Sequence, residues 1–364
     1  MRWWKGLLWA AGVPVLCLGI SFWMRPLDAF DNFSYLEQLF HGVQNRTAWV
    51  GGYRMHYEAE GPADGPPVVL IHGLGGRAED WRALAPHLAK AGYHVYMPDL
   101  IGYGRSARPR NFSYSIHDQA TLVVDFLNTV GLKRVDLGGW SMGGWIVQVM
   151  AYEHPERIKR LMLFDAAGLH VKPTWNTNVF TPRTFTELNQ LDALLMPNPP
   201  HIPYFVGADI LRVSKESGWV VQRAMAQMLS GSNVTDNLLP QLRMPVLIEW
   251  GSADRIIPVE QAKTIHRLVP HSHLDVYSGC GHLAPLQCAG RMAPNVIRFL
   301  KTTPAFSKRI PLSPVNASPS QNTDLDVDVP RSRPCRPTAW ERTSEGWQAR
   351  SPSGSEALDR ENGT

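Results

Sequence analysis

Apolar residues between positions 47 and 301 follow two patterns that alternate along the chain. Short continuous apolar runs, such as 68–71, are typical of strands that are buried on both faces. Between them lie segments such as 116–130, where apolar residues return every three or four positions, as on one face of a helix. This alternation predicts an α/β fold in which helices cover a mostly parallel sheet.

The expected elements follow one another at short intervals. A β-hairpin is expected at 49–60, with its turn at Gly51 and Gly52. Strands are expected at 68–71, 93–97, 134–137, 160–164, 245–250 and 273–277. Helices are expected at 78–91, 116–130, 142–153, 259–268 and 284–300.

A long segment, about 169–242, interrupts this series. It is rich in proline and becomes helical around 218–229. An excursion of this length inside a compact domain is usually functional, and often forms a lid over a site. Its apolar and flexible side chains would suit acyl chains, or would hold the lid against the domain. They are Trp175, Phe180, Phe185, Leu191, Leu194, Leu195, Met196, Trp219, Met225 and Met228.

The N-terminal segment, 1–24, has the pattern of a transmembrane anchor. Residues 6–24 carry no charge over 19 positions, close to the ~20 residues that span a bilayer. Its tryptophans favour a membrane interface, and Arg2 and Lys5 before the run favour a cytoplasmic N-terminus. We therefore expect a single-pass membrane protein whose main domain lies on the non-cytoplasmic side. A connector, 25–46, follows, with apolar residues at helical spacing that could contact the membrane or pack on the domain.

Composition limits the remaining possibilities. Hydrophobic residues make up 44% of the chain, enough for the core of a large domain at 47–301. The tail, 302–364, is rich in Ser, Pro, Arg and Asp and is predicted to be disordered. The net charge is only +4 and forms no basic stripe, so we expect no nucleic-acid partner. Four cysteines match no zinc or redox motif, and whether Cys280 and Cys288 form a disulfide stays open.

The sequence 139–143 reads Gly-Trp-Ser-Met-Gly and matches G-x-S-x-G. It follows an expected strand and opens an expected helix, the context in which this motif forms a sharp turn that exposes its serine. Side chains at the two glycines would collide with neighbouring elements. Ser141 is therefore the candidate nucleophile.

Two backbone N–H groups are candidates for an oxyanion hole. Met142 follows the serine at a helix N-terminus, where negative charge is favoured. Leu74 lies in the glycine-rich loop His72-Gly-Leu-Gly-Gly76, directly after the strand at 68–71. His72 is expected to hold this loop through backbone hydrogen bonds rather than to transfer protons.

The base and the acid come from the last two strand ends. A serine needs an adjacent base, and His282 follows the strand that ends near Tyr277. Asp254 follows the preceding strand, and the order Ser, Asp, His is the order used by this kind of site. Asp165, after the strand at 160–164, is the rival acid.

These motifs together resemble the α/β-hydrolase superfamily. The loop 99–106 and the stretch that begins Gly251-Ser-Ala-Asp254 belong to the same resemblance. With its N-terminal anchor and the stretch Phe164-Asp-Ala-Ala-Gly-Leu169, the chain looks most like membrane-anchored monoacylglycerol lipases and related bacterial esterases. The resemblance covers about 49–300. It implies hydrolysis of carboxylic esters, with lipid-like esters as the expected substrates, through an acyl-enzyme, and neither a metal nor an organic cofactor.

Two other functions stay open at this stage. Carbon–carbon bond hydrolases of the same superfamily also use a serine, but tend to carry an aromatic residue directly after the histidine and an acid soon after. Here Leu283 follows His282, and Gln287 is the first polar residue downstream. A non-catalytic binding protein of this fold would usually have lost a member of the triad, and all three are present.

Overall fold

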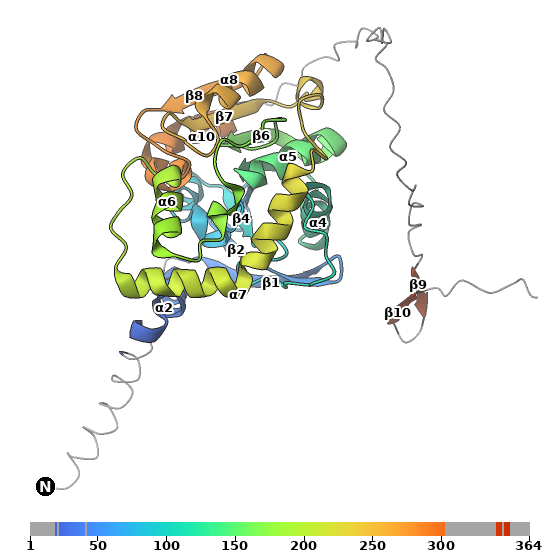
Figure 1. Cartoon of the computed structure of the whole chain (residues 1–364). Coiled ribbons are helices and arrows are strands. Elements are labelled where there is room, and N and C mark those ends of the chain that lie inside the picture. The colour runs from blue at the N-terminus through green and yellow to red at the C-terminus, as the bar shows by residue number, and fades with distance from the viewer. Residues whose placement is uncertain (1–18, 20–21, 41, 303–339, 344–345, 350–364) are drawn as a thin grey trace, which may run out of the picture. The chain divides into compact units, whose positions relative to one another are not determined.

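The computed structural model describes residue 19 and residues 22–40, 42–302, 340–343 and 346–349 (Figure 1). Eight strands form one sheet in the order β1-β2-β4-β3-β5-β6-β7-β8. From β4 to β8 all neighbours are parallel, whereas β2 is antiparallel to both β1 and β4. The strands are β1 (Gln44–Val50), β2 (Tyr53–Glu60), β3 (Pro67–Ile71), β4 (His94–Pro98), β5 (Val135–Trp140), β6 (Ile158–Phe164), β7 (Val246–Gly251) and β8 (His273–Tyr277).

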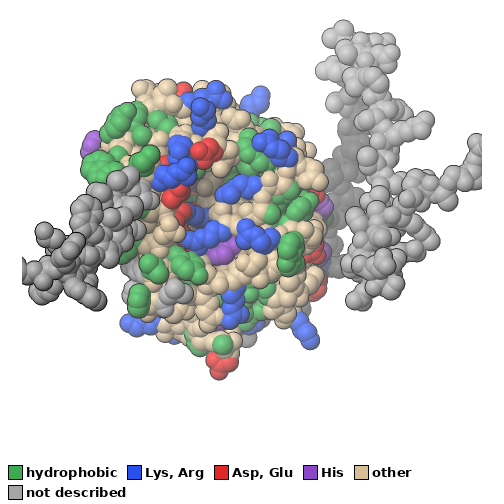
Figure 2. All heavy atoms as spheres, turned by 90° about the horizontal axis from the view of Figure 1, so that it is seen from below, with side chains coloured by type: hydrophobic (Ala, Val, Ile, Leu, Met, Phe, Trp, Pro, Cys, Tyr) green, Lys and Arg blue, Asp and Glu red, His purple; other side chains and the backbone are tan. Residues whose placement is uncertain are grey.

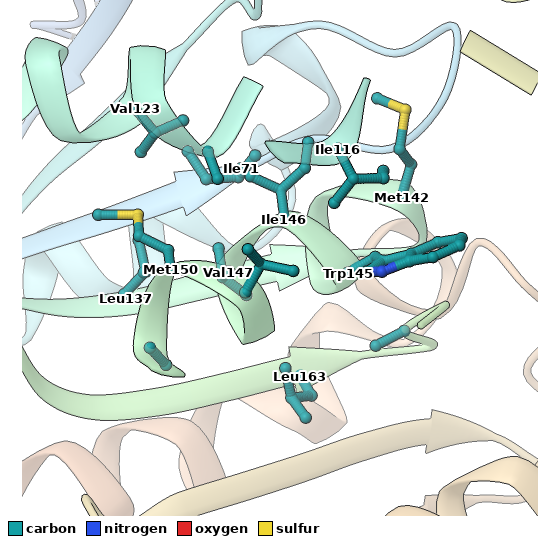
Figure 3. Close-up of a cluster of buried hydrophobic side chains, with 14 of the residues drawn as sticks. Ile71, Ile116, Val123, Leu137, Met142, Trp145, Ile146, Val147, Met150 and Leu163 are labelled. Carbon is teal, nitrogen blue, oxygen red and sulfur yellow. The ribbon is translucent and has the colours of Figure 1, made fainter. Parts of the chain in front are cut away.

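Helices cover both faces of this sheet, because its central strands alternate two sets of apolar side chains. In β3, Val69 and Ile71 point to one core while Val68 and Leu70 point to the other. Figure 3 shows the first core, where Ile146 and Val147 of a helix lie against the sheet. The helices on this side are α4 (Ile116–Thr129), α5 (Met142–Glu153) and α8 (Val259–Leu268); on the other side lie α3 (Ala85–Lys90) and α10 (Ala289–Lys301).

The α/β fold predicted from the sequence is therefore confirmed, with two expected helices interrupted. The first is divided into the 3₁₀ turn η1 (Ala78–Trp81) and α3, which has Pro86 in its first turn. The second is divided at Cys288 into α9 (Ala284–Gln287) and α10. Pro86 and Pro285 stand in the first turn of α3 and α9, where the N–H that proline lacks would have no helical acceptor, whereas α10 contains Pro294 in its interior.

The lid, residues 169–242, contains more helix than the sequence predicts. It includes α6 (Phe185–Leu195) and α7 (Tyr204–Leu229), a 26-residue helix that begins directly after Pro203. The predicted helix at 218–229 is only the second half of α7. Short 3₁₀ turns, η3 (Thr177–Phe180) and η4 (Leu239–Gln241), complete the lid.

The connector forms α2 (Pro26–Phe40), which packs on α7. Within the described part of the chain, no helix is long and apolar enough to cross a membrane. The predicted anchor, 1–24, lies mostly outside that part, because only residues 19 and 22–24 of it are described. From the predicted tail, the structure describes residue 302 and a hairpin of its own, β9 (Trp340–Thr343) with β10 (Gly346–Ala349).

Candidate active site

Ser141 stands in a sharp turn between β5 and α5. Its φ of 56° lies in the left-handed region, which a serine adopts only when its surroundings hold it there. A Cβ at Gly143 would lie 2.3 Å from the carbonyl oxygen of Ile71, so this position of the motif admits no side chain. The strained turn and the required glycine agree with the prediction that this motif presents the serine at the edge of the sheet.

The structure brings the three predicted triad residues together. The Oγ atom of Ser141 lies 2.9 Å from Nε2 of His282, and Nδ1 of His282 lies 2.8 Å from Oδ2 of Asp254. His282 and Asp254 are buried, whereas Ser141 is half-buried and borders a cavity. An imidazole that donates from Nδ1 to Asp254 can accept the serine proton at Nε2, the arrangement required of a general base.

The two rival carboxylates have different partners. Besides its bond to His282, Asp254 accepts at Oδ1 from the N–H groups of Ile256 and Ile257, both at 2.8 Å. Asp165 accepts instead from the N–H of Gly251 at 2.7 Å, and has a φ of 42°. Burial, together with the nearby charge of Asp254, raises the pKa of Asp165 well above its usual range. The geometry therefore places Asp254, and not Asp165, behind the histidine.

Several bonds hold the loop that carries His282. The N–H of Ala253 donates to the carbonyl oxygen of Cys280 at 2.9 Å, which joins the acid loop to the histidine loop. Nε1 of Trp140, the residue before the nucleophile, donates to the carbonyl oxygen of His282 at 2.8 Å. The sequence did not predict this bond, since it joins residues far apart along the chain.

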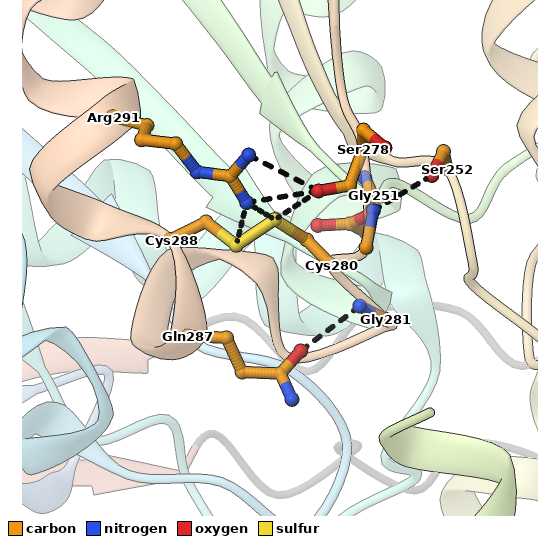
Figure 4. The surroundings of a disulfide bond; sticks show 10 residues. Gly251, Ser252, Ser278, Cys280, Gly281, Gln287, Cys288 and Arg291 are labelled. Atoms are coloured by element: carbon orange, nitrogen blue, oxygen red, sulfur yellow. Dashed lines mark hydrogen bonds between the residues drawn. A yellow bond between two sulfur atoms is a disulfide. The ribbon is translucent and has the colours of Figure 1, made fainter. Parts of the chain in front are cut away.

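The same loop carries a disulfide between Cys280 and Cys288 (Figure 4). This settles a pairing that the sequence left open. The bond ties the histidine loop to the start of α10, and the Arg291 guanidinium covers both sulfur atoms while it donates to the carbonyl oxygen of Ser278. The N–H of Gly281, next to His282, donates to Oε1 of Gln287 at 2.9 Å.

The two predicted oxyanion donors border the serine. Met142 is the first residue of α5, so its N–H is one of those that a helix leaves without an acceptor in its own backbone. Leu74 lines the same cavity as Ser141, and a Cβ at the adjacent Gly73 would lie 3.1 Å from the Cβ of Ser141. The loop therefore passes close enough to the nucleophile for its N–H groups to reach a shared oxyanion.

His72 holds this loop, as the sequence predicts. Its Nδ1 lies 2.8 Å from the carbonyl oxygen of Gly73, and its Nε2 accepts from the N–H of Leu100 at 3.0 Å. Burial lowers the pKa of His72, which keeps the ring neutral and able to accept that bond. Both ring nitrogens are thus engaged in positioning the backbone.

A cavity of about 510 Å³ opens at Ser141. Its walls are mainly apolar and come largely from the lid, with Trp175, Phe180, Met225 and Met228 among them. Other apolar lid residues instead hold the lid together, as where Phe185 stacks on Tyr204 at 4.9 Å. Trp219 packs the lid against the domain, with its ring centre 5.7 Å from that of Tyr114, so one of the two uses that the sequence left open is confirmed, while the acyl-chain use stays a prediction.

A second cavity, of about 580 Å³, was not predicted. It lies between α2, α7 and the loop that carries Gly75 and Gly76, and Phe180 lines both cavities. Its walls are part apolar and part charged, and include Arg77, Arg105, Arg108 and Arg212 with several carboxylates. The sequence alone could not reveal this cavity, because its charged residues come from segments that lie far apart along the chain. Among the residues described, no group of three or more His, Cys, Asp or Glu side chains could hold a metal ion.

Comparison with known proteins finds hydrolases similar to this chain. A model of the α/β-hydrolase fold matches residues 66–202. Lipase 1 of Psychrobacter immobilis is 28% identical over 259 residues, which cover 68% of this chain and 81% of the lipase. A 2-hydroxymuconate semialdehyde hydrolase of Pseudomonas putida is also 28% identical, over 72% of this chain and 95% of that enzyme.

The fold also matches solved structures. A crystal structure described as a membrane phospholipase A, a bacterial virulence factor, superposes with a TM-score of 0.70 at 24% identity. It covers 81% of this chain and 97% of the other, a likeness of fold. Together with the strand order and the turn at Ser141, these matches show that the chain has the α/β-hydrolase fold.

Proposed function

We propose that the protein is a serine hydrolase that cleaves carboxylic esters with lipid-like acyl chains, through an acyl-enzyme on Ser141. The observation that carries this proposal is the continuous chain of hydrogen bonds from Ser141 through His282 to Asp254, at the edge of an apolar cavity. Similarity to Lipase 1 of Psychrobacter immobilis supports the ester as substrate. The specific activity that we favour is hydrolysis of monoacylglycerols, because the sequence resembles monoacylglycerol lipases.

The proposed reaction has two steps. His282 takes the proton of Ser141 as its Oγ attacks the ester carbonyl, and the N–H groups of Leu74 and Met142 stabilise the resulting oxyanion. His282 then protonates the leaving alcohol, which leaves the acyl group on Ser141. In the second step His282 activates a water that releases the acid, and Asp254 stabilises the imidazolium each time it forms.

The apolar cavity supports an acyl chain as the part of the substrate that is bound. Its lid walls offer methionine side chains, which adapt to flexible ligands because they are unbranched and polarizable. Pockets of about 300–1,000 Å³ are the usual size for small-molecule ligands. We further propose that segment 1–24 anchors the protein in a membrane and that the hydrolytic domain lies on the non-cytoplasmic side. A disulfide beside His282 supports an oxidising compartment.

Carbon–carbon bond hydrolysis is the second candidate, and the similarity to the Pseudomonas putida hydrolase is the observation that favours it. Such a reaction would use the same serine and the same histidine. The residues after His282 depart from the pattern of those enzymes, since Leu283 stands where they tend to carry an aromatic residue.

The test is turnover of p-nitrophenyl esters from acetate to palmitate by the wild-type protein and by Ser141→Ala. We expect turnover that depends on Ser141 and that favours medium or long chains. Turnover of the shortest esters alone would contradict the lipid-like substrate. Turnover of 2-hydroxymuconate semialdehyde, with no ester cleaved, would establish the second candidate instead.

A further inference from the structure

Large apolar side chains on α2 and beside it are exposed to solvent. Phe33 is 63% exposed and Phe40 is 89% exposed, values that are unusual for residues of this size. We call this surface the interfacial face, and it consists of Trp23, Phe30, Phe33, Leu36, Phe40 and Tyr204. Contiguous apolar patches of this kind mark an interaction site.

The spacing within α2 explains why these side chains share one side. Phe30, Phe33, Leu36 and Phe40 are three or four positions apart, so they form a stripe along the helix. Ser34, between them in sequence, is buried against the domain. The helix is therefore amphipathic in the unusual sense that its apolar stripe points outward.

The opposite side of α2 is fastened to the domain. The N–H of Leu27 donates to Oδ2 of Asp209 at 3.0 Å, and the Arg77 guanidinium makes two hydrogen bonds to Asp31, at 2.7 and 2.8 Å. The interfacial face is thus a fixed part of the domain surface, and whatever it contacts sets the orientation of the domain.

Basic and aromatic side chains border this face. The Arg82 guanidinium lies 5.6 Å from the centre of the Phe30 ring, and Arg25 is exposed at the start of α2. Figure 2 views the molecule from the side on which α2 and α7 lie in Figure 1, and shows hydrophobic and basic side chains together there. Aromatic residues mixed with arginine are typical of surfaces that lie among lipid head groups.

We infer that the interfacial face lies in the head-group region of a lipid bilayer. The choice of a bilayer rather than a second copy of the chain rests on the proposed anchor, because the uncharged run 6–24 ends directly before α2. A chain that leaves the bilayer at residue 24 keeps Phe30 and Phe33 within a few helical turns of it. The basic side chains at the border would meet lipid phosphates.

This orientation of the domain determines where the second cavity lies relative to the bilayer. The cavity is lined by Leu27, Asp28 and Asp31 of α2 on one side and by Gly75 and Gly76 on the other. With the interfacial face in the bilayer, this cavity, which is lined in part by charged side chains, lies close to the head groups, next to the loop that carries the proposed oxyanion donor Leu74. A lipid ester would then leave the bilayer beside the active site.

Photo-crosslinking in the full-length protein tests the contact without relying on activity. A benzophenone amino acid replaces Phe33 in one variant and, as a matched control, Val276 in another, since Val276 is 45% exposed on β8 at the far end of the sheet. Both proteins are reconstituted with vesicles of phosphatidylcholine and phosphatidylglycerol. We expect lipid adducts at position 33 and few at 276. Equal yields at both positions, or a crosslinked dimer at 33, would overturn the inference.

A second measurement links the face to substrate delivery. The variant Phe33→Ser/Leu36→Ser/Phe40→Ser is compared with Tyr152→Ser/Val276→Ser, which removes exposed side chains elsewhere. The readout is the ratio of turnover on a vesicle-embedded ester to turnover on soluble p-nitrophenyl butyrate. A smaller amount of folded protein lowers both rates equally and therefore leaves this ratio unchanged. We expect the ratio to fall about tenfold or more in the first variant only. An unchanged ratio would overturn the inference, while absence of all ester turnover would refute only the proposed function.

Discussion

The loops that carry the triad lie beside the lid, and the two regions differ in how they are held. In the loops, backbone hydrogen bonds and a disulfide fix each residue, as where Ala253 N–H donates to Cys280. The lid wall has a few hydrogen bonds, such as that from Trp175 Nε1 to the carbonyl oxygen of Ile256, but consists mainly of apolar side chains such as Met225 and Met228. The contrast suggests that the loops determine which bond is cleaved and that the lid determines which chains are accepted.

The largest expected effect comes from the acid. Asp254→Asn would lower kcat about 10⁴-fold on every ester, because the amide no longer holds the histidine in the tautomer that accepts the serine proton. Steady-state kinetics on a short and a long p-nitrophenyl ester would check this. Asp165→Asn is the matched control, since Asp165 bonds Gly251 and not His282. An equal loss in both variants would show that the two carboxylates act together.

Loss of the disulfide should lower kcat less than Asp254→Asn does, but again to the same extent on all esters. Cys280→Ala/Cys288→Ala would lower kcat about tenfold on short and long esters alike, because a freer loop misplaces His282. The free energy of unfolding, measured with urea, should fall by about 2–3 kcal/mol. Cys335→Ala, in the predicted tail, removes a different thiol and serves as control. A loss restricted to long esters would break the proposed division between loops and lid.

A substitution in the lid should change only the preference of the enzyme for acyl chains of a given length. Met228→Trp would fill part of the apolar cavity, so we expect turnover of p-nitrophenyl palmitate to fall about tenfold while acetate is unaffected. Met228→Leu keeps the volume and should preserve both activities. A loss on acetate as large as on palmitate would mean that the lid also positions the triad.

Much of this site could be predicted from the sequence because its signals are local. The strand, the glycines and the serine of 139–143 lie side by side, and each strand end that carries a triad member is a short apolar run followed by a turn. A parallel sheet brings such ends to one edge whatever the details of packing. The succession of strands and helices along the chain and the approximate bounds of most elements followed from periodicity, whereas the order of the strands within the sheet did not.

The remaining features depend on contacts between distant segments. The bond from Trp140 to His282 spans 142 positions, and the second cavity combines charges from α2, α7 and two loops. The first half of α7 was missed because prolines at 197–203 obscured its start, although Pro203 immediately precedes the helix. The periodicity of apolar residues also could not show which side of α2 packs on the domain, so it did not predict that the apolar stripe of this helix is exposed.

The smallest expected effect concerns the buried Asp165. Burial and the charge of Asp254 raise the pKa of Asp165, so the folded protein binds more protons than the unfolded chain above the ordinary carboxyl pKa of about 3.9. This contribution to stability is therefore present at low pH and is lost as pH rises toward the raised pKa. Asp165→Asn keeps an oxygen for the Gly251 N–H and should make the stability less dependent on pH. Urea unfolding at about pH 5 and about pH 8 would check the slope; an unchanged slope would contradict this assignment.

Acid-quenched mass spectrometry would show most directly whether ester cleavage passes through an acyl group on Ser141. The protein is mixed with p-nitrophenyl octanoate, quenched during turnover and digested. We expect an octanoyl group on the peptide that contains Ser141, and its absence in Ser141→Ala together with loss of turnover. Release of p-nitrophenol with no acyl group on Ser141, or turnover that persists in Ser141→Ala, would contradict this expectation.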